Sequence, residues 1–377
     1  MTEVLGSRSP EPLGWRDRWR ALRNAVIGDA GFQRWAGMFP LTRPVARRRA
    51  RALFDLTAGF VYSQITYACV HSGILTLLAA KPQSTAAVGR HAHLSPSAAE
   101  RLLKAGAALG LTEACGDERW GLGQQGAALL GASGVAEMIE HHTLLYADLA
   151  DPLALLQREG GGGRLSSYWP YAEGRREADA GAASAYSGLM SASQGMVSAQ
   201  VLDAYPLRRH RRLLDVGGGD GTFLRAVAAR CPGLELELFD LPAVADVARG
   251  KLATAGVAAD VRGGSFLNDP LPQGADVISL VRVLHDHDDA AVLTVLKAVR
   301  RALAPNGTLL IVEPMSDVRG AEPIGDAYFG FYLLAMGSGR PRSVAELHGL
   351  LTHAGFSRSR LHRTAMPMIA QVLAARV

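Results

Sequence analysis

Short β-rich apolar runs alternate with helical segments over the second half of the chain. The runs are RLLDVGG, LELELFDLP, ADVISLVRVLHD and GTLLIVEPM, and they begin at Arg212. Alternation of this kind predicts an α/β fold, in which an open, mostly parallel sheet carries helices on both faces. Helical segments are also predicted over 172–204, ahead of the first run.

The first half of the chain has the periodicity of helices. Residues 53–80 show helical periodicity. The apolar region from about Leu56 to Ala80 is predicted as two buried helices rather than a membrane span, because polar residues such as Gln64 and His71 interrupt it. Further on, Ser84 and Ser95 each stand where a helix N-cap is expected, and Ser95 is followed by proline.

A short hairpin and another helix follow these two capped helices. The stretch TEACGDERWGLGQQGAALL predicts a hairpin with its turn at Gly116–Asp117. Two helices joined by a turn and followed by a hairpin make a winged-helix pattern. At 377 residues the chain exceeds one typical domain. We therefore predict an N-terminal arm over 1–45, a winged-helix-like domain over 46–185 and an α/β domain over 186–377.

Charge is spread unevenly along the chain. The formal net charge is +5, yet residues 1–51 hold eleven arginines against four acidic residues, so the remainder is slightly acidic. The candidate recognition helix 97–109 offers Arg101 and Lys104 among many alanines. This balance argues against a nucleic-acid partner. The basic arm, with tryptophans interleaved, fits either an anionic membrane surface or a clasp on a second subunit.

The three cysteines bear on the compartment. Cys69, Cys115 and Cys231 are far apart and fit neither a disulfide framework nor a metal site. A cytoplasmic location is therefore expected, with peripheral contact at the inner membrane if the arm binds lipid.

The stretch LLDVGGGDGTFL places closely spaced glycines at the end of the first strand run, where open α/β sheets bind ligands. Asp215, Gly217, Gly219 and Gly221 alternate with other residues. A dinucleotide fingerprint needs a glycine where Thr222 stands, and a phosphate loop needs a lysine that is absent. Glycines with acidic neighbours suit a ligand that has cationic groups and no polyphosphate.

The next strand run ends at Asp240, about 20 residues beyond the glycines, and is followed by Leu241. A carboxylate at this place is typical of a nucleoside site, because it accepts hydrogen bonds from two ribose hydroxyls. The segment Gly264-Ser265-Phe266 precedes the third run and can border an adenine. These features in this order predict a nucleoside-containing ligand.

Residues 213–313 resemble the class I S-adenosylmethionine-dependent methyltransferases, and roughly 46–377 resembles the two-domain small-molecule O-methyltransferases, which include hydroxyindole and plant phenol methylating enzymes. The resemblance implies a Rossmann-like methyltransferase domain, a winged-helix domain that forms a homodimer, and S-adenosyl-L-methionine as cofactor. Ser265 stands where this family usually has aspartate. The predicted cofactor site comprises Asp215, Gly217, Gly219, Gly221, Asp240, Leu241, Gly264, Ser265, Phe266 and Arg282.

Three stretches resemble the bacterial carotenoid hydroxyl methyltransferases that act on hydroxyneurosporene or demethylspheroidene. They are PLTRPVARRRARALFDLTAGFVYSQ, LVRVLHDHDD and FYLLAMGSGRPRS. The resemblance implies a methyl acceptor with a tertiary hydroxyl on an acyclic carotenoid. Two alternatives remain at this point: a C-methyltransferase acting on a bacteriochlorophyll-type tetrapyrrole, and a winged-helix regulator that senses S-adenosylmethionine.

His285 follows a strand run at the cofactor rim, and we predict it as the base that accepts the hydroxyl proton. Glu313, at the end of the next run, is the predicted partner that orients the imidazole ring. The resembling family supplies a second glutamate where this chain has Pro341. The cluster of histidines and aspartates from His285 to Asp289 is interpreted as a loop that starts a helix, and no metal is expected.

Apolar residues in DAYFGFYLLAMGSG recur at helical spacing. Phe329, Tyr332 and Met336 are candidates to line the acceptor pocket, and plain helix core explains the same spacing equally well.

Overall fold

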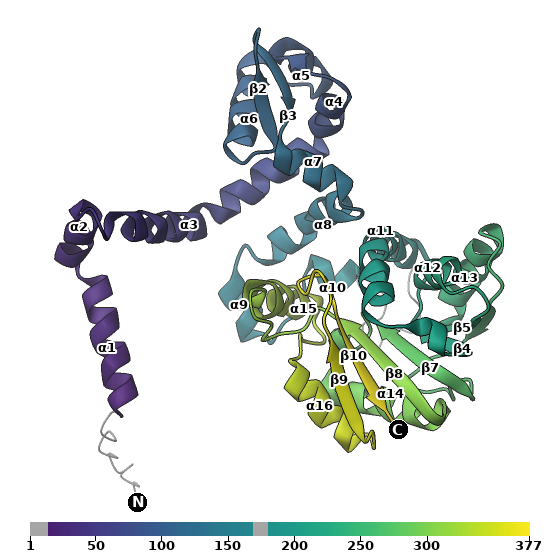
Figure 1. Cartoon of the computed structure of the whole chain (residues 1–377). Helices are drawn as coiled ribbons and strands as arrows, with labels where there is room; N and C mark the ends of the chain where they lie inside the picture. The colour runs from purple at the N-terminus through teal and green to yellow at the C-terminus, as the bar shows by residue number, and fades with distance from the viewer. Residues whose placement is uncertain (1–13, 169–179) are drawn as a thin grey trace, which may run out of the picture. The chain divides into compact units, whose positions relative to one another are not determined.

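The computed structural model describes residues 14–168 and 180–377 (Figure 1). The chain forms two compact units, one ending at Ala68 and the other running from Cys69 to Val377. The boundaries predicted after residues 45 and 185 stay predictions. Part of the range 172–204, where helical segments are predicted, lies outside the described residues. Its described part is helical from Ala180 to Ala204.

The first unit consists of helices, which are α1 (Trp15–Gly28), α2 (Ala30–Met38) and most of α3 (Arg43–His71). Asp29 begins α2, because its side chain accepts a hydrogen bond from the Phe32 amide at 2.6 Å. The expectation that the region from about Leu56 to Ala80 is buried is wrong for its first part in α3, where Leu56 and Phe60 are 82% and 72% exposed, whereas Cys69 near the end of α3 is buried.

The winged-helix pattern is present at the start of the second unit. Its elements are α4 (Ile74–Ala80), β1 (Gln83–Ser84), α5 (Thr85–His91), α6 (Pro96–Ala108), β2 (Thr112–Cys115), β3 (Arg119–Leu122) and α7 (Gln124–Gly131). The side chains of Ser84 and Ser95 cap α5 and α6, as the sequence predicts. The strands form a small antiparallel sheet in the order β1-β3-β2, with the predicted turn between β2 and β3.

The main sheet has seven strands in the order β6-β5-β4-β7-β8-β10-β9. The strands are β4 (Arg212–Val216), β5 (Glu235–Asp240), β6 (Asp260–Gly263), β7 (Ala275–Val281), β8 (Leu303–Glu313), β9 (Arg358–His362) and β10 (Gln371–Arg376). The five strands from β6 to β8 are parallel, which confirms the mostly parallel sheet. The antiparallel strands β10 and β9, of which β9 forms the edge of the sheet, were not predicted.

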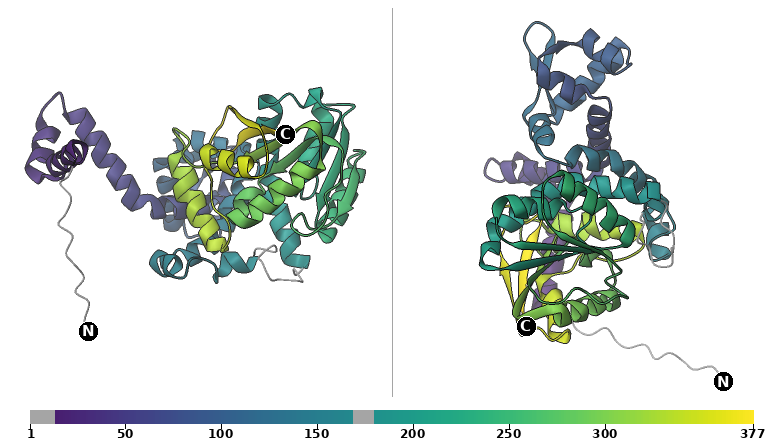
Figure 2. Two further views of the ribbon diagram at one scale, coloured as in Figure 1. Left: turned by 90° about the horizontal axis from the view of Figure 1, so that it is seen from below. Right: turned by 90° about the vertical axis from the view of Figure 1, so that its right-hand side faces the viewer.

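Helices cover both faces of this sheet (Figure 2). They are α11 (Ala180–Ala204), α12 (Thr222–Arg230), α13 (Pro242–Thr254), α14 (Asp289–Ala302) and α16 (Val344–His353). Successive side chains of β8 point to opposite faces. Leu309 and Ile311 pack in a core with α14 and α16, whereas Leu310 and Val312 pack in a core with α11, α12 and α13. Burial on both faces explains the nearly continuous apolar runs in the sequence.

A third core cluster joins helices from both halves of the second unit. It packs α15 (Gly330–Met336) against α8 (Val135–Asp148), α9 (Pro152–Gln157) and α10 (Arg164–Tyr168). A π-helical segment, Pro323–Phe329, leads into α15. Within the described ranges, none of the helices has both the length and the apolar character needed to cross a membrane.

Candidate functional site

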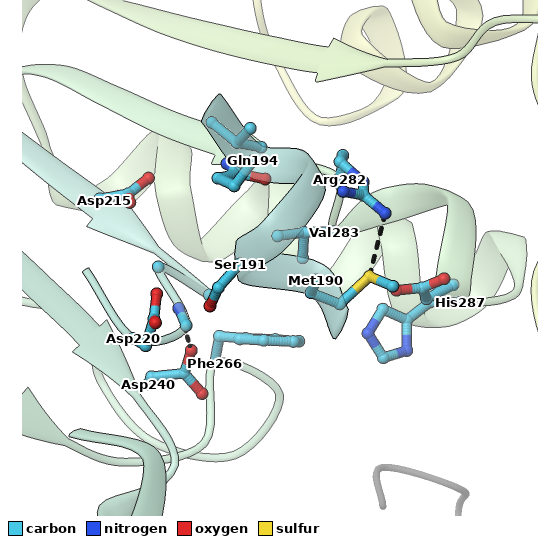
Figure 3. A pocket seen from close by; sticks show the side chains of 15 residues that line it. Met190, Ser191, Gln194, Asp215, Asp220, Asp240, Phe266, Arg282, Val283 and His287 are labelled. Atoms are coloured by element: carbon cyan, nitrogen blue, oxygen red, sulfur yellow. Dashed lines mark hydrogen bonds between the residues drawn. The ribbon is translucent and has the colours of Figure 1, made fainter. Parts of the chain in front are cut away.

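A pocket opens at the carboxyl ends of β4, β5 and β7, where ligands bind in open α/β sheets (Figure 3). Its wall combines the turn Gly217–Gly221 between β4 and α12, here called the glycine turn, with the ends of these strands and one side of α11. The lining residues are Met190, Ser191, Gln194, Asp215, Gly217, Gly218, Gly219, Asp220, Asp240, Phe266, Val281, Arg282, Val283, Asp286 and His287.

The glycine turn brings main chain, rather than side chains, to the pocket. Gly217 and Gly219 have φ angles of 70° and 58°, which side-chain-bearing residues rarely adopt. A Cβ atom at Gly218 would lie 2.7 Å from Oδ2 of Asp215, so only glycine fits there. The amide of Gly219 donates to Oδ2 of Asp240 at 2.8 Å, which ties the turn to the end of β5.

Two buried carboxylates face this pocket. Oδ1 of Asp215 accepts from the Ser279 hydroxyl at 2.6 Å, while its Oδ2 has no hydrogen-bond partner among the described residues. Asp240 accepts from the amides of Gly219 and Leu241. Burial raises the pKa of Asp215 to about 7 and that of Asp240 to about 6. Ligand groups that donate hydrogen bonds or carry positive charge would favour the ionised forms.

A third aspartate, Asp220, lies in a different electrostatic environment. Burial alone would raise its pKa, but the ammonium of Lys251, 2.6 Å from Oδ2, holds that pKa below the usual value. Asp220 lines the pocket and lies inside the glycine turn, but it was not predicted as a site residue.

One side of the pocket is closed by α11. Arg282, whose φ angle is 59°, donates from Nη1 to the hydroxyl of Ser193 at 2.8 Å and from Nη2 to the sulfur of Met190 at 2.9 Å (Figure 3). Met190, Ser191 and Gln194 were missed by sequence reasoning. No motif marks them, because their place in the pocket depends on how α11 packs on the sheet.

His285 lies between two carboxylates in the turn after β7. Its Nε2 is 3.1 Å from Oδ1 of Asp286, and its Nδ1 is 3.6 Å from Oε1 of Glu313. Oε1 of Glu313 also accepts from the His285 amide at 3.0 Å. Burial disfavours the imidazolium, but Asp286 and Glu313 outweigh it and raise the pKa of His285 to about 9.

The predicted base and its predicted partner are therefore adjacent, and a further acid contacts the base. Asp286 and His287 line the pocket, whereas His285 is buried behind them. Sequence reasoning missed Asp286 as a partner of His285, although the two residues are neighbours in the chain.

Four predicted cofactor residues are not among those that line the pocket. Gly221 precedes α12, and the amide of Leu241 donates to Asp240. The amide of Gly264 donates to the carbonyl of Asp240, and that of Ser265 donates to Asp269. Phe266, in contrast, forms part of the pocket wall and contacts the His287 ring edge-on.

The predicted acceptor residues divide into two groups. The ring of Phe329 meets the His285 ring edge-on, with 6.2 Å between centroids. Tyr332 and Met336 are buried in the cluster with α8, α9 and α10, and the Tyr332 hydroxyl is 3.0 Å from Nε2 of His141. Helix packing accounts for Tyr332 and Met336 in this structure, and only Phe329 reaches the predicted base.

The acidic residues after His287 begin a helix, as the sequence predicts. Asp288 caps α14 by accepting from the Ala291 amide, and Asp289 forms ion pairs with Arg340 and Arg342. In the parts of the chain that the structure describes, no group of three His, Cys, Asp or Glu residues is placed to hold a metal ion.

Comparison with known proteins agrees with this architecture. A family model described as an O-methyltransferase domain matches residues 146–357. The demethylspheroidene O-methyltransferase of Cereibacter sphaeroides is 44% identical over 355 residues, which cover 93% of each chain. That of Rhodobacter capsulatus is 42% identical over 340 residues, 89% of this chain and 84% of the relative.

A solved structure shares the fold over most of the chain. Human N-acetylserotonin methyltransferase in complex with SAM aligns with a TM-score of 0.75 and 26% identity, covering 87% of this chain and 97% of that one. The family model spans more than half of the chain, and the Cereibacter relative is similar over nearly its whole length. The chain therefore belongs to the O-methyltransferase family.

Proposed function

We propose that this protein is an S-adenosylmethionine-dependent O-methyltransferase that methylates the tertiary hydroxyl of an acyclic carotenoid intermediate of the hydroxyneurosporene or demethylspheroidene type. The observation that carries the proposal is the 44% identity to a demethylspheroidene O-methyltransferase over 93% of both chains. Similarity of this extent covers nearly the whole chain and is not confined to the methyltransferase domain.

The pocket fits S-adenosylmethionine in its donor and acceptor chemistry. Oδ2 of Asp215 is buried without a hydrogen-bond partner among the described residues, so it can accept from a cationic group of a ligand. Each carboxylate oxygen of Asp240 accepts one hydrogen bond from a backbone amide and can accept a further one from a ribose hydroxyl. The cofactor, when bound, supplies an activated methyl group on a sulfonium. Asp215, Asp240 and the glycine turn would hold it.

The protein contributes mainly by positioning. Holding the acceptor oxygen in line with the methyl carbon can supply up to about 7–11 kcal/mol. His285 accepts the hydroxyl proton at Nε2 while the oxygen is alkylated, which adds about 10²–10⁴-fold. Asp286 faces Nε2 in the present structure. The acceptor hydroxyl must therefore displace that carboxylate, while Glu313 on the Nδ1 side stabilises the imidazolium.

We infer that the protein assembles as a homodimer through α3. Leu53, Leu56 and Phe60 lie one turn apart on this helix and are 65%, 82% and 72% exposed. An apolar stripe of this length marks an interaction surface. Light scattering of the full-length protein tests the inference, and a monomeric mass at micromolar concentration would contradict it.

We further infer peripheral contact with an anionic inner-membrane surface through α1. Trp15, Trp19 and Leu22 share one face of this helix and are exposed, while arginines occupy the neighbouring positions. An exposed face of aromatic and apolar residues flanked by arginines is typical of helices that lie in a membrane interface. A membrane-dissolved carotenoid would be reached from such a position.

The function is tested by turnover. Purified protein is incubated with demethylspheroidene, hydroxyneurosporene or a tetrapyrrole and with S-adenosylmethionine labelled in its methyl group. Mass spectrometry should find one labelled methyl group on the carotenoid hydroxyl. Transfer to carbon of the tetrapyrrole, with none to the carotenoids, would overturn the proposal.

A further inference from the structure

A buried arginine lies directly beneath the turn that carries the proposed base. The Arg342 side chain is completely buried, and it immediately precedes the capping residue of α16. Burying a guanidinium is costly unless its donors are satisfied. Here Nη1 donates to the carbonyl of Leu284 at 2.8 Å and Nη2 to the carbonyl of His287 at 2.7 Å, while Nε donates to Asp289 at 2.8 Å.

The two carbonyls that Arg342 binds belong to the residues on either side of the His285–Asp286 pair. One rigid planar group therefore links the two ends of the turn. The same segment makes a further contact, because the hydroxyl of Ser338 donates to the carbonyl of Asp286. The backbone at Gly339 also approaches so closely that a Cβ atom would collide with the main chain of His285 and Asp286.

Contacts of the imidazole also depend on this turn. Its Nδ1 makes only a long ion pair, 3.6 Å, with Glu313, and its Nε2 is 3.1 Å from Asp286, which belongs to the same turn. The direction of the ring therefore depends in part on the backbone of the turn, which Arg342 and Ser338 hold. Arg340 differs from Arg342, because it binds the same Asp289 from the surface and is 44% exposed.

We propose that Arg342 is a positioning residue of the methyl transfer, which sets the direction of His285 by clamping the carbonyls of Leu284 and His287. The proposal rests on the proposed role of His285 as the base. Arg342 touches neither reactant, so its loss should reduce the rate of the chemical step more than it weakens cofactor binding.

The test compares Arg342→Lys with the control Arg340→Ala, which removes an arginine from the same Asp289 without touching the turn. Lysine keeps the charge but cannot bind two carbonyls and a carboxylate in one plane. We expect kcat to fall about 100-fold, the usual cost of a misplaced reacting group, while the affinity for S-adenosylhomocysteine changes less than fivefold. Arg340→Ala should retain kcat within twofold. Guanidinium ion at non-denaturing concentration should restore part of the activity of Arg342→Ala.

Hydrogen exchange gives a second readout that does not depend on an acceptor. Peptides covering 283–290 should exchange faster in Arg342→Lys than in the wild type or in Arg340→Ala. Wild-type exchange and wild-type kcat in Arg342→Lys would overturn the proposal. If the wild type methylates no acceptor, the proposed function fails, and hydrogen exchange alone then tests whether Arg342 holds the turn.

If Arg342→Lys does not fold, Ser338→Ala replaces it as the test variant. This variant should lower kcat and speed hydrogen exchange over 283–290. If neither quantity changes, the proposal for Arg342 is overturned.

Discussion

The proton on His285 determines how this enzyme should respond to pH. Asp286 and Glu313 overcome the effect of burial and raise the pKa of His285 from 6.5 to about 9. This rise corresponds to about 3 kcal/mol of preferential interaction with the imidazolium. A base must be neutral to accept a proton, so at pH 7 about 1% of the molecules hold a competent imidazole. That fraction should grow about tenfold between pH 7 and pH 8 and reach about one half at pH 9.

Stability should change in the opposite direction over the same range. Because the pKa of His285 is higher in the folded protein than in the unfolded chain, the ion pairs stabilise the fold fully below pH 6.5. That contribution is lost as the pH rises through 9. We therefore expect the melting temperature to fall between pH 6.5 and 9 while the methyl transfer rate rises, and the fall in melting temperature should be smaller in His285→Gln.

The assay is single-turnover methyl transfer from pH 6 to pH 10, with the cofactor saturating at every point. Saturation is needed because the pKa values of Asp215 and Asp240, about 7 and 6, make cofactor affinity depend on pH as well. Glu313→Gln removes one of the two carboxylates beside His285 and should lower the midpoint of the profile by about one pH unit.

Two results would refute this reasoning. A rate that is flat between pH 7 and pH 9 would show that no group with the raised pKa of His285 must lose a proton. Retention of most activity by His285→Gln, which keeps polarity and approximate shape without basicity, would show that positioning alone suffices. The hydroxyl proton would then pass to water after the transfer.

Three other predictions follow from the pocket, the base and the arm. Asp240→Ala should weaken binding of S-adenosylhomocysteine more than tenfold in calorimetry without added metal, because each lost bond to a charged acceptor costs about 1.5–3 kcal/mol; unchanged affinity would remove Asp240 from the cofactor site. The double variant His285→Ala/Glu313→Gln should have a kcat little lower than that of His285→Ala alone, since Glu313 acts through His285. If the losses in kcat of the two single variants add in the double variant, Glu313 acts independently of His285. Deleting residues 1–40 should reduce binding to anionic vesicles and leave S-adenosylhomocysteine affinity intact, and vesicle binding that survives the deletion would assign the arm to assembly.

Local pattern was sufficient to predict the parallel part of the sheet and the contact between His285 and Glu313. Strand runs buried on both faces are continuous in the sequence, and the carboxyl ends of parallel strands meet at one edge. Residues that end neighbouring strands are therefore brought together even though they are 28 positions apart. The glycine turn could also be predicted from the sequence, because closely spaced glycines permit positive φ angles.

Tertiary structure alone placed α11 over the pocket and Arg342 beneath the turn. Met190 reaches Arg282 across 92 positions, and Arg342 reaches Leu284 across 58. No periodicity in the sequence marks either contact. The position of a helix on a sheet, or of a loop beneath a turn, depends on the packing of many elements that are distant in the sequence. Tyr332 is a further example. Its helical spacing suits both a pocket and a core, and only the tertiary structure shows that it packs with α8, α9 and α10.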